Sequence, residues 1–245
     1  MPVPWTPERG AYPTSIDGQP CVVTVDMGAV RHGAVSTHPN FLSIRVRLQR
    51  PLDSGLPIDA ERAELDSLHE RLEAEVVAAA DGLFVARHCS SGFFYLGFYV
   101  PAAPQRSPNL TDGYDPYKPE FRFEADPEWR ILHDEFAPDD WQQQLIETGR
   151  MMTQLDLLGD DHPAKRKVDH TILIPAGADR SAVLDRITEQ GYTIDNVTVY
   201  DAETSINFSR LDNLTEPFAR VTEAFELAQD CGGTYDGWGA PVTKP

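Results

Sequence analysis

The sequence predicts an α+β protein of two domains, residues 14–140 and residues 141–245, each built on an antiparallel sheet. Three observations predict this class. The length of 245 residues suits two ordinary domains, the hydrophobic share of 41% supports a packed core, and the two halves carry different orders of strands and helices. We expect an α/β sandwich in the first domain and a ferredoxin-like arrangement of strands and helices in the second.

The first half predicts a sheet of short strands after a proline-containing extended arm at residues 1–13. Phe41–Leu48 is the clearest strand because apolar and polar side chains alternate along it. Two β-rich runs, Leu83–Cys89 and Phe93–Val100, flank a short Ser-Ser-Gly turn and predict a hairpin. The remaining predicted strands are Cys21–Val25, Glu120–Glu124 and Trp129–Phe136.

One long helix and a proline-rich break complete this half. Residues 59–80 predict the helix because leucines and a valine recur every three or four positions, and Asp81-Gly82 predicts its end. Residues 101–119 contain five prolines and predict no regular helix. A further helix that begins near Pro138 is expected to join the two halves.

The second half has the element order β-α-β-β-α-β. Gly191 predicts the end of its first helix and Gly232-Gly233 the end of its second. Right-handed crossovers then predict a ferredoxin-like sandwich, a four-stranded antiparallel sheet with two helices on one face. The predicted strands are 168–174, 192–200, 204–211 and 235–242, and the helices are 179–190 and the segment after Thr215.

The composition excludes several classes of protein. A formal net charge of −18 repels phosphate, so direct nucleic-acid binding is not expected, and basic protein partners are favoured. Three scattered cysteines do not form a disulfide framework and predict a reducing, cytoplasmic setting. The N-terminal residues predict no signal peptide, and no apolar run predicts a membrane span.

The sequence carries no recognisable catalytic, metal or cofactor motif. Phosphate-binding glycine loops, the GxSxG motif and the HExxH pair are all absent. His32 and His38 flank one loop, but such histidines are more often exposed than ligating. His88 and Cys89 are neighbours in a strand and therefore point to opposite faces, which excludes an ordinary Cys–His dyad. We predict a protein that is not an enzyme, and the residues indicate neither a cofactor nor an oligomeric state.

Two stretches of the second half resemble the regulator of ribonuclease E activity B family. One is Lys167-Val168-Asp169-His170, which opens the first strand, and the other is the closing block CGGTYDGWG at Cys231–Gly239. The resemblance covers about residues 142–245. It implies a regulator that binds ribonuclease E and inhibits RNA cleavage through protein–protein contact, without masking the substrate.

The first half resembles an uncharacterised domain that is often joined N-terminally to that family. The matching residues are Val25–Gly28, Ile44–Val46, Phe98–Pro101 and Asp126–Trp129. Members of that family usually carry a second helix before the last of these blocks. Here the equivalent stretch, Ala102–Pro119, is broken by prolines, so no function is assigned to such a helix.

The closing block also supplies candidate partner-binding residues. A regular strand from Thr234 would place Tyr235 on one face and Asp236 with Trp238 on the other. An unpaired buried carboxylate is costly, so the face of Asp236 is expected to be open, and Trp238 would be an exposed anchor for a partner. The alternative is that Trp238 covers the sheet and that Asp236-Gly237 forms a bend.

Asp169 and His170 complete the candidate partner-binding set. They either form a buried hydrogen-bonded pair that orders the end of the sheet or meet a partner on its open face.

The working hypothesis is a cytoplasmic regulator that binds a ribonuclease through Arg- and Lys-rich segments of that partner. The alternatives are a generic acidic scaffold with a different partner, and a hydrolase that combines His88, Cys89 or His133 with a carboxylate in a deep pocket.

Overall fold

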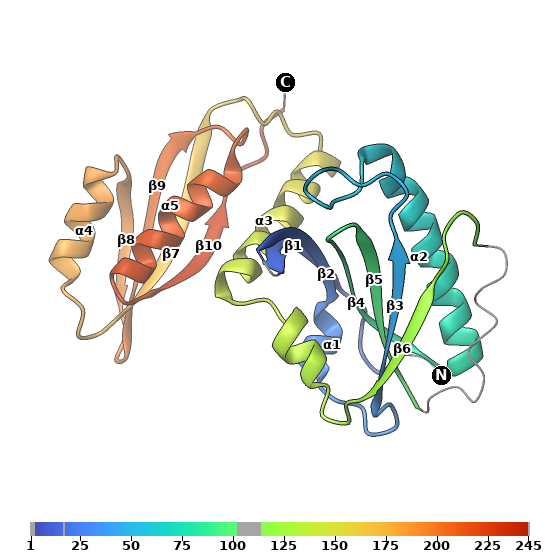
Figure 1. Cartoon of the computed structure of the whole chain (residues 1–245). Coiled ribbons are helices and arrows are strands. Elements are labelled where there is room, and N and C mark those ends of the chain that lie inside the picture. The colour runs from blue at the N-terminus through green and yellow to red at the C-terminus, as the bar shows by residue number, and fades with distance from the viewer. Residues whose placement is uncertain (1–2, 17, 102–113, 245) are drawn as a thin grey trace. The chain divides into compact units, whose positions relative to one another are not determined.

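The computed structural model describes residues 3–16, 18–101 and 114–244, and the chain divides into two units, Met1–Gln142 and Gln143–Pro245 (Figure 1). Each unit contains one antiparallel sheet, which confirms the predicted α+β class. Most of the proline-broken stretch Ala102–Pro119 lies outside the described residues.

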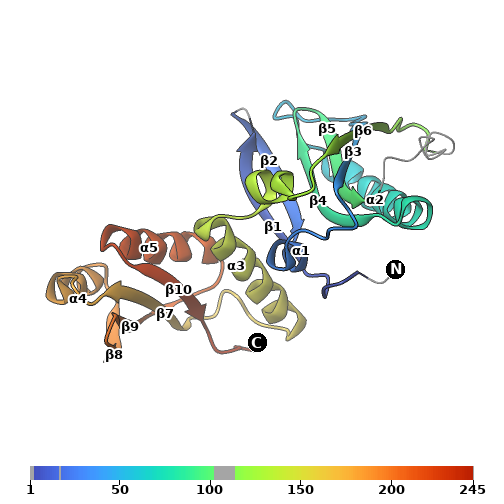
Figure 2. The same ribbon diagram turned by 90° about the horizontal axis from the view of Figure 1, so that it is seen from below.

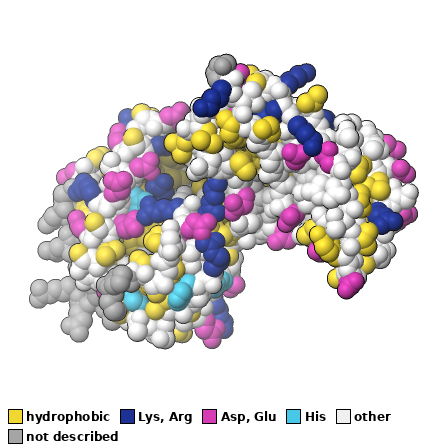
Figure 3. All heavy atoms as spheres, turned by 180° about the vertical axis from the view of Figure 1, so that it is seen from behind, with side chains coloured by type: hydrophobic (Ala, Val, Ile, Leu, Met, Phe, Trp, Pro, Cys, Tyr) yellow, Lys and Arg dark blue, Asp and Glu magenta, His cyan; other side chains and the backbone are white. Residues whose placement is uncertain are grey.

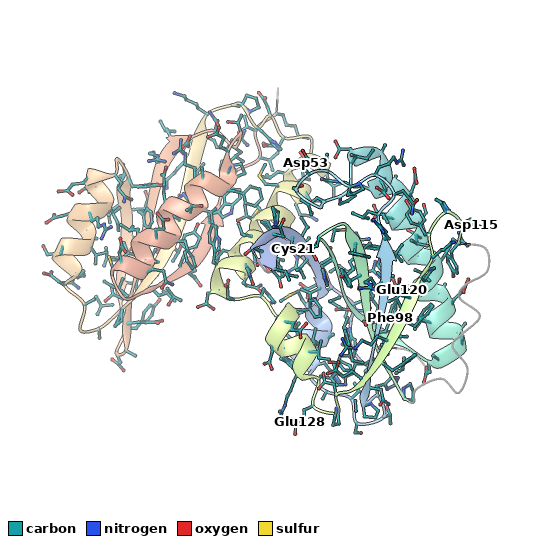
Figure 4. All side chains as sticks on the ribbon, viewed as in Figure 1. Cys21, Asp53, Phe98, Asp115, Glu120 and Glu128 are labelled. Atoms are coloured by element: carbon teal, nitrogen blue, oxygen red, sulfur yellow. The ribbon has the colours of Figure 1, made fainter. Side chains whose placement is uncertain are left out.

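The N-terminal unit is built on a six-stranded sheet in the order β1-β2-β4-β5-β3-β6. Helix α2, Asp59–Ala80, covers one face of this sheet, and its apolar stripe packs against alternate residues of β3 and β5, including Phe98, which Figure 4 labels. The predicted helix and hairpin are both confirmed. The strands are β1 (Arg9–Ile16), β2 (Gln19–Asp26), β3 (Asn40–Arg47), β4 (Leu83–Ser90), β5 (Phe93–Val100) and β6 (Glu120–Ala125).

Two predictions for this unit were wrong. The N-terminal arm is not extended throughout, because Arg9–Ile16 pairs with β2 as an edge strand, a position in which Pro13 is tolerated. Trp129–Phe136 is not a strand, because the Asp126 carboxylate accepts hydrogen bonds from the backbone N–H groups of Arg130 and Ile131 and starts a helical turn. This turn continues into the short π-helix η1, Leu132–Phe136.

The Asp126–Trp129 block builds a buried aromatic cluster. The Trp129 ring is fully buried and stacks on Tyr99 with 4.0 Å between the ring centroids. The Tyr99 hydroxyl donates to Asp126 Oδ2 over 2.6 Å, and Trp129 Nε1 donates to the His38 carbonyl over 2.9 Å. The block is therefore part of the core.

The Val25–Gly28 block has an equally structural role. The Asp26 carboxylate caps α1, Met27–His32, and also accepts from Trp5 Nε1 over 3.0 Å. A Cβ atom at Gly28 would lie 2.4 Å from the Thr6 carbonyl oxygen, so only glycine lets the N-terminal segment pack here.

The C-terminal unit contains a four-stranded sheet in the order β10-β7-β9-β8 (Figure 2). Helices α4 and α5 lie on one face, against the alternate buried residues of β7, which confirms the ferredoxin-like arrangement. Helix α3, Asp140–Leu157, precedes the sheet. The other elements are β7 (Arg166–Pro175), α4 (Arg180–Glu189), β8 (Thr193–Val199), β9 (Glu203–Asp212), α5 (Pro217–Asp230) and β10 (Thr234–Gly239).

Candidate functional site

An open groove of about 560 Å³ lies in the C-terminal unit between α3 and the strands β7 and β10. The helix contributes one wall, with polar side chains and Met151, and the strands contribute the other. The strand residues that line the groove are Asp169, Thr171, Asp236, Gly237, Trp238 and Gly239. Three of the five predicted partner-binding residues, Asp169, Asp236 and Trp238, therefore meet in one place.

A β-bulge in β10 decides which side chains reach the groove. Tyr235 pairs with Ile172 and Gly237 pairs with Thr171, so Asp236 is an extra residue without a partner in β7. Beyond the bulge Trp238 pairs with His170, and it therefore lies on the same face as Tyr235. The regular-strand prediction, which separated Tyr235 from Trp238, was wrong because it did not anticipate this bulge.

Gly237 permits the bulge. Its φ of 127° lies in a region that side-chain-bearing L-residues rarely adopt, and no atom lies within 4 Å of where its Cβ would be. The glycine is therefore required by the backbone conformation and not by close packing.

Trp238 is half-buried and held from one side. Its Nε1 donates to Thr148 Oγ1 on α3 over 3.1 Å. Its ring packs against a small buried cluster that contains Leu155 and Val168, with Met151 and Met152 beside it. The ring thus has a fixed orientation while part of it remains at the groove, and its role as an anchor for a partner stays a prediction.

His170 and Tyr235 belong to the core and do not line the groove. His170 is 2% exposed, and its Nδ1 lies 2.8 Å from the Tyr235 hydroxyl. Burial, reinforced by the charge of Arg210, lowers the pKa of His170 to about 4. Burial also raises the pKa of Tyr235, so both groups are neutral near pH 7.

Asp169 does not pair with His170, because adjacent strand residues point to opposite faces. Its carboxylate lies 3.0 Å from Lys167 Nζ, which also lies 3.1 Å from Asp195. These two carboxylates raise the pKa of Lys167. The expected buried Asp–His pair is therefore replaced by a His–Tyr pair on one face and a surface ion pair on the other.

The groove carries mainly negative charge. Asp236 is exposed, Asp169 is half-exposed, and Glu147 lies on the opposite wall, 2.8 Å from Arg150 Nη1. Acidic side chains are also scattered over the face that Figure 3 shows. Such a groove can receive the ammonium or guanidinium group of a lysine or arginine beside the Trp238 ring.

Each of the two units matches a known protein family. Residues 10–136 match a family of unknown function, DUF695, and residues 145–240 match the family Regulator of ribonuclease activity B, or RraB. The chain belongs to the DUF695 family and carries an RraB region after it. Both predicted resemblances are thereby confirmed. Neither the search of curated proteins nor the search of solved structures found a match.

Within the RraB region, α3 contributes groove residues that were not predicted from the sequence. Gln144 Nε2 donates to the Tyr235 carbonyl over 3.2 Å, and Thr148 holds Trp238. The sequence predicts for this helix only that it joins the two halves. The signal was present, because Gln144, Glu147, Met151 and Gln154 recur at helical spacing on one face.

The other candidate sites do not assemble. His38 is buried and bonds to the Asp81 carbonyl, whereas His32 is exposed and bonds to the Gly33 carbonyl. Burial raises the pKa of Cys89 to about 12, so its thiol is not a nucleophile near neutral pH. Across the described residues, no three His, Cys, Asp or Glu side chains gather as a metal site would require. None of the described helices has the length and apolar character that crossing a bilayer requires.

Proposed function

We propose that this protein is a non-catalytic cytoplasmic regulator of RNA decay, whose RraB region binds a ribonuclease through the groove between α3 and β10. One observation carries the proposal. The YDGW stretch, which marks the RraB resemblance most strongly, supplies three consecutive residues of the groove wall, Asp236, Gly237 and Trp238.

The chemistry of the groove fits a basic protein segment. Trp238 offers an aromatic surface whose orientation is already set by Thr148, so little conformational entropy is lost when a partner contacts it. The carboxylates of Asp169 and Asp236 lie on the strand wall, where they complement Lys and Arg side chains. The net charge of −18 favours such a partner and disfavours direct contact with RNA.

Affinity capture followed by an RNA-cleavage assay tests the proposal. The full chain is immobilised, cell extract is passed over it, and bound proteins are identified by mass spectrometry. We expect a ribonuclease to be retained at low salt, to be released as salt rises, and to cleave RNA more slowly in the presence of this protein. If no ribonuclease is retained and cleavage is unchanged at large excess, the proposal is wrong. Retention of an unrelated basic protein instead would favour the generic acidic scaffold.

Substitutions in the groove test the mode of binding. Asp236→Asn removes one charge at an exposed position, and we expect it to weaken ribonuclease binding about tenfold, or ~1.4 kcal/mol. Asp201→Asn makes the same change in the turn between β8 and β9, outside the groove, and should leave binding unchanged. Equal loss in both variants would show that overall charge, and not this groove, provides the affinity.

A further inference from the structure

The DUF695 region contains a second hollow, of about 220 Å³, on the sheet face opposite to α2. It lies above the central strands β3, β4 and β5 and is closed on one side by η1. Its aromatic and polar lining includes Phe41, Ser43, His88, Tyr95, Glu135 and Phe136. All of these residues belong to the N-terminal unit, so the hollow is independent of the ribonuclease proposal.

Strand register creates the hollow. Gly97 in β5 is paired with Ala86 on one side and with Ser43 on the other, so three small residues lie side by side across the sheet. A Cβ atom at Gly97 would lie 2.7 Å from Phe41 Cζ, which shows that the Phe41 ring leans over the glycine. Small side chains therefore form the floor of the hollow and leave space above the sheet.

Aromatic rings form the walls. The His88 and Tyr95 rings stack with 4.4 Å between their centroids and a 12° angle between their planes. Phe136, the last residue of η1, lies 6.5 Å from Phe41 and 5.7 Å from His88, centroid to centroid. A planar or apolar ligand would contact aromatic rings on two sides of the hollow.

Three polar side chains of the lining have no polar partner among the described residues. The side chains of Ser43, His88 and Glu135 make no hydrogen bond or ion pair with any residue in the described part of the chain. Burial lowers the pKa of His88 to about 4, so its imidazole is neutral near pH 7. The one basic residue of the lining, Arg122, lies 3.3 Å from Glu124 and is matched by it.

Glu135 is an exposed carboxylate at the edge of the hollow and makes no ion pair within the described residues. Its pKa is raised, first by burial and then by the negative charges of Glu124, Asp134 and Asp126. The groups that face it from the packed strands are Glu124 and Arg122 of β6, His88 of β4 and Tyr95 of β5. An added positive charge would relieve this repulsion.

We propose that this hollow binds a small organic cation, an amine or guanidine carried on a single planar or apolar body. The rings would contact the body and attract its charge, and Glu135 would be the counter-ion. The volume lies below the roughly 300 Å³ at which pockets for drug-sized ligands begin, so the ligand is of single-ring size.

The geometry supports binding and not hydrolysis. Ser43 and His88 lie on strands separated by β5, and two strand spacings are about 10 Å, too far for a hydroxyl to donate to the imidazole. Cys89 packs against the core on the opposite face. The pocket therefore contains His88 and carboxylates, as the hydrolase alternative requires, but it contains no activated nucleophile.

Titration of the full-length protein with three probes tests the ligand class. Phenethylamine carries the cation, 2-phenylethanol has the same shape without charge, and acetyl-arginine amide represents a protein side chain. By isothermal titration calorimetry and NMR shift mapping at pH 7, we expect phenethylamine to bind at least tenfold more tightly than 2-phenylethanol. Equal binding of the alcohol, no binding of the amine, or tighter binding of acetyl-arginine amide would overturn the proposal.

Variants locate the binding. Glu135→Gln should weaken phenethylamine at least fivefold, whereas Asp134→Asn, which removes a neighbouring charge outside the hollow, should change affinity less than twofold. Ser43→Leu should abolish binding by filling the hollow, with circular dichroism as the control for folding. Affinity should also fall as the pH is lowered in the native protein, because the raised pKa of Glu135 lets its carboxylate take up a proton earlier than an ordinary glutamate does, and should stay level in Glu135→Gln. Unchanged affinity in Glu135→Gln would overturn the assignment even if Ser43→Leu failed to fold.

Discussion

The two regions use the same kinds of residue in opposite ways. In the DUF695 region, Asp126 and Trp129 are buried, and each hydrogen-bonds within the unit. In the RraB region, Asp236 is exposed and Trp238 is half-buried beside an open groove. An Asp–Trp signature therefore marks a core in one region and a candidate binding surface in the other, and burial distinguishes the two.

The largest expected effect is that of removing the buried tryptophan. Trp129→Ala deletes a fully buried ring and should cost the DUF695 region about 3–5 kcal/mol of unfolding free energy. Trp238→Ala should cost the RraB region only about 1–2 kcal/mol, because the ring is half-buried. Urea unfolding followed by circular dichroism measures both. Equal losses would break the comparison and assign Trp238 to the core.

The next effect is a pH dependence that arises from His170. Its pKa is about 4 in the folded protein and about 6.5 when unfolded, so the unfolded state binds the proton first. The stability from this group is complete above pH 6.5 and is lost as the pH falls towards 4. From pH 7 to 4.5 we expect a loss of about 2 kcal/mol, measured as the difference between the native protein and His170→Gln. A difference that did not change with pH would contradict a buried neutral imidazole.

A smaller effect should separate two glycines of the groove. Gly237→Ala places a side chain at a φ of 127° and should cost about 1–2 kcal/mol. Gly239→Ala is the matched control, because its Cβ would also meet no atom within 4 Å and its φ is ordinary, so a change within about 0.5 kcal/mol is expected. Thermal unfolding of both variants tests whether the backbone conformation at the bulge requires glycine, as opposed to a lack of room for a side chain.

The smallest effect concerns the hydrogen bond that orients Trp238. Thr148→Val removes the acceptor of its indole N–H while keeping the shape of the side chain, at a cost of about 1 kcal/mol. Thr153→Val, on an exposed turn of the same helix, is the control. If ribonuclease binding weakens only in Thr148→Val, orientation of the ring contributes to recognition. Loss of stability without loss of binding would limit Thr148 to packing.

Much of the fold could be predicted because local patterns and tertiary contacts agree. The helix at Asp59–Ala80 follows from its apolar stripe, and the β-α-β-β-α-β order leads directly to the observed sheet of the RraB region. The prediction for Trp129–Phe136 was wrong because a nearby carboxylate, Asp126, accepts hydrogen bonds from the N–H groups of Arg130 and Ile131 and starts a helical turn. Apolar content alone does not distinguish the two conformations.

The candidate site was predictable only in part. Asp169, Asp236 and Trp238 were identified from the sequence and do line the groove, whereas His170 and Tyr235 lie in the core. His170 and Tyr235 are buried on the face of the sheet that the helices cover. The bulge at Asp236 explains a different error, the face assigned to Trp238, since one inserted residue exchanges the two faces of a strand beyond it.

The sequence by itself determined the α+β class, the order of elements, the acidic surface and the two family resemblances, because these depend on composition, periodicity and short motifs. Only the tertiary structure decided which side chains are buried and which meet. Thr148 and Trp238 are 90 positions apart and come together through packing, and the hollow over Gly97 exists because three strands share one register. Contacts between distant segments depend on the whole set of packed elements, which no local stretch of the chain specifies.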